Sequence, residues 1–233
     1  MGSDELHEFS AEARWEAAPA IALVIAGQIL LALLSRESGW RLSGLPWWHW
    51  LVAVAPELVL IGALTHEVPR SRLAELGHLR NAAILLVGVI TVANSVSLAA
   101  LIGSLVNGHE HSGAELLLKG APIWGTNVVA FGLWFWELDS GGPIARRLNA
   151  RRQAPPPPAD FQFPQQENPT LAAPDWHPHL FDYIYIAFTN AIAFSPTDAM
   201  PLSRPAKGLM LLESAISALT VLLVAARAVN ILS

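Results

Sequence analysis

Residues 82–106, AAILLVGVITVANSVSLAALIGSLV, contain no charged side chain. A helix crosses the hydrocarbon core of a bilayer with about 20 apolar residues, so this stretch is long enough to span a membrane. Asn94, Ser95 and Ser97 lie near its centre. Small and polar residues are typical of helix–helix contacts in membranes, which indicates that this segment packs against other helices.

Further apolar segments lie on both sides of this one. They are residues 17–34, 50–65, 121–136, 180–194 and 206–232. The whole chain is 53% hydrophobic and 14% charged, a composition that is hard to reconcile with a water-soluble domain. The sequence therefore predicts an all-α integral membrane protein with six transmembrane helices, of which the short fifth either crosses the membrane or is re-entrant.

Composition divides the chain into four parts. A polar, acidic tail at 1–16 precedes a predicted four-helix transmembrane bundle at 17–138. Because the tail lacks the basic start of an export signal, we expect the first apolar segment to stay as an anchor. Residues 139–179 are predicted to lie outside the membrane, since four consecutive prolines favour an extended polyproline II spacer. Residues 180–233 form the last predicted helical hairpin.

Lysine and arginine positions predict the orientation of the helices. With a cytoplasmic N-terminus and six crossings, eight basic residues lie inside and five outside. The inside set is Arg14, Arg70, Arg72, Arg80, Arg146, Arg147, Arg151 and Arg152, and the outside set is Arg36, Arg41, Lys119, Arg204 and Lys207. The sequence thus predicts a multi-pass protein of the cell membrane with its N-terminus in the cytoplasm.

Several kinds of chemistry have no support in the sequence. The chain has no cysteine, which excludes disulfides and thiolate metal sites. It has no nucleophile elbow, phosphate loop or dinucleotide fingerprint, so we expect neither an enzyme nor a cofactor. A net charge of -5 with scattered basic residues does not suggest nucleic-acid binding.

The C-terminal part begins with DYIYIAFTNAIAFSPTDAMPLSRPAKG, residues 182–208, and continues into a long apolar segment. From Asp182 onward the sequence resembles the pore module of the two-helix potassium-channel superfamily, in which a pore helix, a filter loop and an inner helix follow one another. Phe188 and Thr189 match the turn of the pore helix toward the filter, and Asp198 matches the aspartate that ends the filter. The whole chain is similar to small bacterial multi-pass membrane proteins with such a C-terminus.

The resemblance fails at the filter itself. Ser195, Pro196 and Thr197 stand where the family has Gly-Tyr-Gly. A potassium filter presents rings of backbone carbonyls, and its glycines adopt angles that other residues disfavour. Proline fixes one backbone torsion and restricts the residue before it, so potassium selectivity is not expected.

The resemblance implies a pathway through an oligomer, a tetramer as in that family, for a small ion or solute. The residues expected to line it are Thr189, Asn190, Ser195, Thr197, Asp198, Glu213, Ser217 and Thr220. The alternative is a membrane scaffold that conducts nothing, in which the same side chains form buried hydrogen bonds.

The two alternatives also differ on topology. An external re-entrant fifth segment with a cytoplasmic C-terminus would place Arg146 and Arg147 outside, so the charges favour a fifth segment that crosses.

Polar side chains within predicted spans are the other candidate sites. Glu213, Ser217, Thr220 and Arg227 recur at helical spacing, which predicts that they share one face of the last helix. That face is either a polar conduit or an interface of helix–helix hydrogen bonds. Glu57, which follows Pro56, is either a proton or cation site or a neutral acid paired with Asn94 or Asn127.

Two histidine clusters are weak candidates for a metal site, and no metal is predicted. His109 and His111 flank Glu110, and His177 and His179 flank Pro178. Histidine and carboxylate side chains are ligands that zinc accepts. The fourth predicted span separates the two clusters, so a joint site is excluded if that span crosses. Solvated loop histidines are the ordinary explanation.

Overall fold

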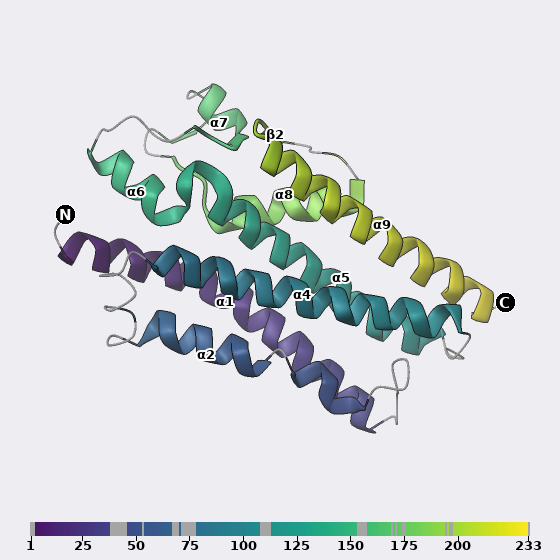
Figure 1. Ribbon diagram of the computed structural model, residues 1–233. Helices are drawn as coiled ribbons and strands as arrows, with labels where there is room; N and C mark the ends of the chain where they lie inside the picture. Colours follow the sequence, from purple (N-terminus) through teal and green to yellow (C-terminus); the bar gives the residue numbers. More distant parts are fainter. Residues whose placement is uncertain are drawn as a thin grey trace. The chain divides into compact units, whose positions relative to one another are not determined.

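The structure is a computed structural model of the 233-residue chain (Figure 1). It describes residues 3–37, 46–52, 54–66, 70, 78–107, 113–152, 158–168, 170, 172–173, 176–193, 195 and 198–232. Helices dominate these ranges, and the one sheet among them has two short strands. The prediction of an all-α fold is therefore confirmed.

The elements follow one another in a simple order. They are α1 (Ser3–Glu37), η1 (Trp47–Leu51), α2 (Val54–Thr65), α4 (Leu79–Val106), α5 (Gly113–Leu138), η2 (Asp139–Gly141), α6 (Pro143–Arg152), β1 (Phe161–Gln162), α7 (Pro164–Glu167), α8 (Leu180–Ala193), β2 (Met200–Pro201) and α9 (Arg204–Leu232). The two strands pair antiparallel, with Phe161 opposite Pro201 and Gln162 opposite Met200.

Four of the described helical stretches are long and apolar enough to cross a membrane. They are Trp15–Glu37, Leu79–Val106, Gly113–Asn149 and Arg204–Ala226. Two predicted spans are shorter, since α2 has 12 residues and α8 has 14, whereas a crossing helix needs about 20. A membrane location is plausible on this basis, but the predicted six transmembrane helices are not confirmed.

The early end of α8 agrees with Pro196 in the sequence, because proline disfavours helix at the residue before it.

The chain divides into two compact units. Unit 1 comprises residues 1–20 and 131–214, and unit 2 comprises residues 21–130 and 215–233.

An aromatic core fills unit 1. Phe131, Phe135, Phe161 and Tyr183 are all fully buried. Successive ring centroids lie 6.2 Å apart for Phe131 and Phe135, 5.2 Å for Phe135 and Phe161, and 6.2 Å for Phe161 and Tyr183. Tilted and edge-on aromatic pairs of this kind add to the stability that burial gives. The core holds the end of α5, strand β1 and the start of α8 together.

The close approach of α5 and α8 within unit 1 depends on Gly132. A Cβ atom at this position would lie 2.8 Å from Cγ1 and 2.9 Å from Cα of Ile184. No real Cβ tolerates such distances to a neighbouring backbone, so only glycine allows α8 to pack here.

Unit 2 has a hydrophobic core to which each of its longer helices contributes. The buried cluster is Leu31, Ala32, Trp50, Leu98, Leu101, Leu116, Ile123 and Val224. The Trp50 indole N–H donates to Ser35 Oγ at 2.8 Å, so η1 is fixed to the end of α1. A Cβ atom on Gly120 would lie 3.0 Å from Val224, which indicates close contact of α5 with α9 in this unit.

Candidate functional site

The candidate site lies where α8 contacts the first part of α9 in unit 1, and the two helices lie alongside each other in Figure 1. Asn190 Nδ2 donates to Glu213 Oε2 at 2.7 Å and to the Met210 carbonyl at 3.0 Å. Ser214 Oγ donates to Asn190 Oδ1 at 3.1 Å. Asn190 is 2% exposed and Glu213 is fully buried. These contacts make a polar cluster inside an apolar helix pair.

The chain enters and leaves α8 at the same end of unit 1. Near the start of α8, the Tyr183 hydroxyl donates to Asp139 Oδ2 at 2.6 Å. After α8, Pro201 of β2 pairs with Phe161, whose backbone N–H donates to Asp139 Oδ1 at 3.2 Å. Asp139 is thus close to both flanks, whereas Asn190 lies farther along, beside Glu213. Strand β2, which follows α8, therefore lies at the end of unit 1 at which α8 began.

The other predicted lining residues of this segment are arranged differently. Thr189 is half-buried, and its hydroxyl donates to the carbonyls of Tyr185 and Ile186 in its own helix. Ser195 and Asp198 are exposed on the returning segment, and Thr197 lies outside the described residues. The structure thus brings Asn190 and Glu213 together but leaves Ser195 and Asp198 apart from that pair, on the surface.

The predicted polar face of α9 is buried. Glu213 and Ser217 have no exposed surface, and Thr220 is 3% exposed. In unit 2, Asn127 Nδ2 of α5 donates to Ser217 Oγ at 3.2 Å, while the Thr220 hydroxyl donates to the carbonyl of Ile216. The Arg227 side chain lies outside the described part of the chain. On this face Glu213 and Ser217 take part in hydrogen bonds between helices, whereas Thr220 bonds within α9.

Glu57 of α2 is fully buried and pairs with α1 rather than with the predicted asparagines. Gln28 Nε2 donates to Glu57 Oε1 at 2.9 Å. The second carboxyl oxygen, Oε2, has no hydrogen-bond partner among the described residues. Asn94 borders the same pocket as Gln28, and Asn127 bonds to Ser217. Of the two alternatives for Glu57, a hydrogen bond to either asparagine is not seen among the described residues.

The histidine clusters do not assemble a metal site in the described ranges. His109 and His111 lie outside them. Glu115, which follows the first cluster, pairs with Lys119 at 2.7 Å. The ring centroids of His177 and His179 lie 4.5 Å apart, and the rings are tilted by 44° to each other. No group of three or more histidine, aspartate or glutamate side chains within reach of one ion occurs among the described residues.

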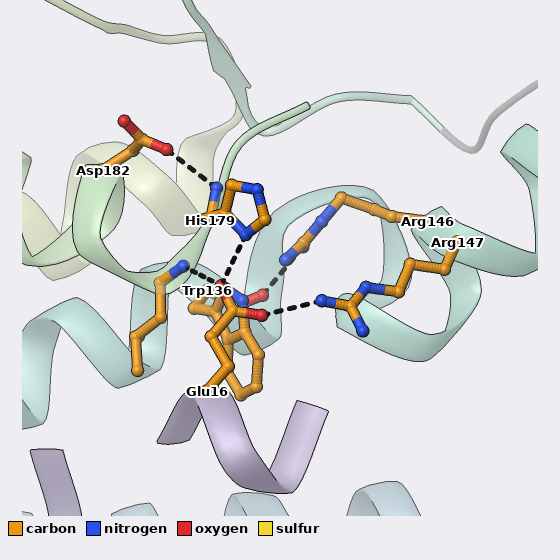
Figure 2. Close-up of polar contacts among 7 residues, drawn as sticks. Glu16, Trp136, Arg146, Arg147, His179 and Asp182 are labelled. Atoms are coloured by element: carbon orange, nitrogen blue, oxygen red, sulfur yellow. Dashed lines mark hydrogen bonds and ion pairs between the residues drawn. The ribbon is translucent and has the colours of Figure 1, made fainter. Parts of the chain in front are cut away.

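A polar junction centred on Glu16 in unit 1 was not predicted from the sequence (Figure 2). The Glu16 carboxylate on α1 lies 2.9 Å from Arg147 Nη2 on α6 and 3.3 Å from His179 Nδ1, and it accepts the backbone N–H of Leu180. The backbone N–H of His179 donates to Asp182 Oδ2 at 2.7 Å, which satisfies a free N–H at the start of α8. The junction ties α1, α6 and α8 together.

A second unforeseen assembly surrounds Asp139, which is 1% exposed. Besides Tyr183 and Phe161, its carboxylate accepts the backbone N–H of Asp160 at 2.8 Å. Arg146 Nη1 donates to the carbonyls of Trp136 and Asp139 at 2.8 and 2.6 Å. In the sequence, this corner is marked by the glycine pair at 141 and 142, a residue type that favours the end of a helix.

The backbone after Asp139 turns through unusual angles. Ser140, Gly141 and Gly142 have φ values of 51°, 83° and 95°. Positive φ is easy for glycine and costs other residues energy, so the glycines allow the sharp turn from α5 into α6. The turn brings Arg146 back over the last carbonyls of α5.

Comparison with protein-family models, curated proteins and solved structures finds no match for this chain.

Proposed function

We propose that this protein is an integral membrane protein whose C-terminal part is a re-entrant pore module that passes small ions without selectivity for potassium. In this proposal α8 is the pore helix, the segment after it is the filter loop, and α9 is the inner helix. The observation that carries the proposal is the return of the chain to Asp139 on both sides of α8. A helix of 14 residues is short for a crossing, and the chain after it is back at the end where the helix began. Together they have the path of a re-entrant loop.

A re-entrant α8 changes the number of crossings to five. They are α1, α4, α5, α9 and the shorter stretch from η1 through α2. With an odd number of crossings, the N-terminus and the C-terminus lie on opposite sides of the membrane. The segment between α5 and α9 then lies on the side of the N-terminus.

This topology agrees with the charge rule better than six crossings do. Ten of the 14 basic residues fall on the side of the N-terminus, namely Arg14, Arg70, Arg72, Arg80, Arg146, Arg147, Arg151, Arg152, Arg204 and Lys207. The other four are Arg36, Arg41, Lys119 and Arg227. The positive-inside rule therefore places the N-terminus and the mouth of the re-entrant loop in the cytoplasm. The C-terminus is then outside, the reverse of the orientation that the family resemblance implies.

The chemistry of the loop supports ion passage of low selectivity. The stretch 188–201 has no glycine, so a ladder of backbone carbonyls is disfavoured. Asp198 and Ser195 are exposed on the returning segment and are free to face a pathway between copies of the chain. A carboxylate at a pore mouth attracts cations, so we expect cations to pass in preference to anions.

Topology is the first test. A reporter inserted at residue 157 is expected to be cytoplasmic, and one placed after residue 233 is expected outside. Reporters on the same side would mean that α8 crosses, which contradicts the re-entrant module.

Ion flux is the second test. Purified protein in liposomes is expected to pass monovalent cations, and Asp198→Asn is expected to lower the flux or its preference for cations. Glu167→Gln is the matched control, because Glu167 is exposed on α7 in the same unit and loses the same charge. Silent liposomes across ions and pH would refute conduction.

A second candidate is a non-conducting membrane scaffold. The observation in its favour is that Asn190, Glu213 and Ser217 have hydrogen-bond partners within the chain and are all buried. It predicts that Asn190→Ala lowers the yield of folded protein and that wild-type liposomes carry no current. The flux measurement separates the two candidates.

A further inference from the structure

Unit 2 contains a pocket of about 580 Å³, bordered by α1, η1, α2, α4 and α5. Pockets that hold small molecules have volumes of roughly 300–1,000 Å³, so this one is large enough for a ligand. Most of its wall is apolar, and the contributors include Leu31, Trp50, Val89 and Ile123. No charged side chain borders it among the described residues. A ligand with a charged head would have no counter-charge here.

The outer wall of the pocket faces away from the protein core. Val52, Leu85, Val92 and Val96 border the pocket and are each more than half exposed. In a membrane-spanning unit, apolar side chains that are exposed on α4 contact lipid tails. A molecule that enters the pocket would therefore come from the bilayer and not from water.

The inner wall carries polar groups that an acyl chain cannot satisfy. Asn94 is 7% exposed and borders the pocket, as does Thr126. Neither side chain forms a hydrogen bond within the described part of the chain. An amide offers two N–H donors and a carbonyl acceptor, and leaving such groups unpaired in hydrocarbon is costly.

We propose that the pocket binds a neutral lipid with a hydroxyl head group, such as a long-chain or isoprenoid alcohol. A hydroxyl donates one hydrogen bond and accepts others, so it can pair with the carbonyl and an N–H of the Asn94 amide at once. The apolar chain of the lipid packs against the pocket wall formed by Leu31, Val89 and Ile123. The proposal depends on the membrane location of unit 2 but not on ion conduction, so it stands or falls separately from the flux experiment.

Photolabelling in proteoliposomes tests the proposal. One probe is a C16 alcohol that carries a diazirine at mid-chain, and the other is the same chain without the hydroxyl. Mass spectrometry then measures labelling of peptides from 85–97 and 123–126. We expect the alcohol to label these peptides about fivefold more than the alkane, the factor that one net hydrogen bond contributes. Unlabelled hexadecanol should compete.

Three variants assign the effect to the pocket. Asn94→Leu is expected to reduce labelling by the alcohol to that by the alkane. Gly88→Leu is expected to reduce both, because Gly88 borders the pocket and a Cβ atom there meets nothing within 4 Å. Ser95→Leu is the control, since Ser95 is exposed on the same helix and does not border the pocket.

Equal labelling of the wild-type protein by the two probes would overturn the proposal, because the pocket would then accept any acyl chain. Labelling by the alcohol that is unchanged in Asn94→Leu would overturn it as well. If Asn94→Leu does not fold, the wild-type ratio together with Gly88→Leu still decides the question.

Discussion

Asn190 on α8 and Glu213 on α9 share a hydrogen bond of 2.7 Å although 23 positions separate them in the sequence. Glu213 Oε1 has no partner among the described residues, so Asn190 supplies the hydrogen bond recorded for this buried carboxyl group. A carboxyl group in an apolar setting needs such a partner. The pair thus links α8 to α9 within unit 1.

Asn190→Ala is expected to lower the free energy of unfolding by about 1–3 kcal/mol, because it leaves the Glu213 carboxyl buried without this partner. Thermal melting of the purified protein in detergent measures the loss. Thr189→Ala is the control, since the Thr189 hydroxyl bonds only within its own helix in the recorded contacts, and it is expected to cost much less. The double change Asn190→Leu with Glu213→Leu should recover part of the loss. If the Asn190→Ala variant melts at the same temperature as the wild-type protein, the pair has no structural role.

Gly132→Ala is expected to destabilise the packing of α8 on α5, because the new methyl group would lie less than 3 Å from Ile184 backbone and side chain. Overpacking of this kind costs about 1–3 kcal/mol. Gly125→Ala is the matched control on the same helix, where a Cβ atom meets nothing within 4 Å. It should be neutral or stabilising by up to about 1 kcal/mol, the helix propensity gained. Equal melting temperatures of the two variants would show that α8 does not pack as described.

Asp139→Ala is expected to cost at least about 2 kcal/mol, because two backbone N–H groups and the Tyr183 hydroxyl lose their acceptor. Hydrogen exchange at Asp160 and Phe161 should become faster. Tyr183→Phe removes one bond only and should cost about 1 kcal/mol while exchange at these two amides stays slow. Slow exchange in Asp139→Ala would mean that other groups hold this strand in place.

Glu16→Gln is expected to weaken the junction of α1, α6 and α8 by about 1 kcal/mol, since the Glu16 and Arg147 side chains are both partly exposed. The loss should shrink at high salt, which screens exposed pairs. Glu37→Gln is the control, because Glu37 is an exposed acid at the end of the same helix. The exchange of charges, Glu16→Arg with Arg147→Glu, should restore part of the stability. A loss that is equal at low and high salt would exclude an ion pair as its cause.

Apolar length and helical spacing predicted much of the fold. Residues 82–106 became the greater part of α4, and Glu213, Ser217 and Thr220 are all buried, as their shared face requires. Both patterns are local, so one sequence is enough to recognise them. Two predicted spans, now α2 and α8, have only 12 and 14 helical residues, so they are not confirmed as crossings. From the sequence alone, a short apolar run fits either a tilted crossing or a re-entrant helix.

The hydrogen-bond partners of the polar residues could not be predicted from the sequence. Asn127 meets Ser217 across 90 positions, and Arg147 meets Glu16 across 131. Such pairs depend on how helices are arranged, which periodicity does not encode. The role of Asp139 was out of reach for a similar reason, since the groups that donate to its carboxylate come from Asp160, Phe161 and Tyr183, 21 to 44 positions away.

Arg146 donates to the carbonyls of Trp136 in α5 and Asp139 in η2, and this position of its charge limits how α5 can move. A guanidinium stays charged at any physiological pH and resists entry into hydrocarbon. In the proposed topology, sliding α5 by one turn, about 5.4 Å, toward the far face of the membrane would pull this charge below the headgroups. The Arg146 guanidinium therefore opposes a piston movement of α5 in that direction, whereas tilting and rotation remain open to the helix.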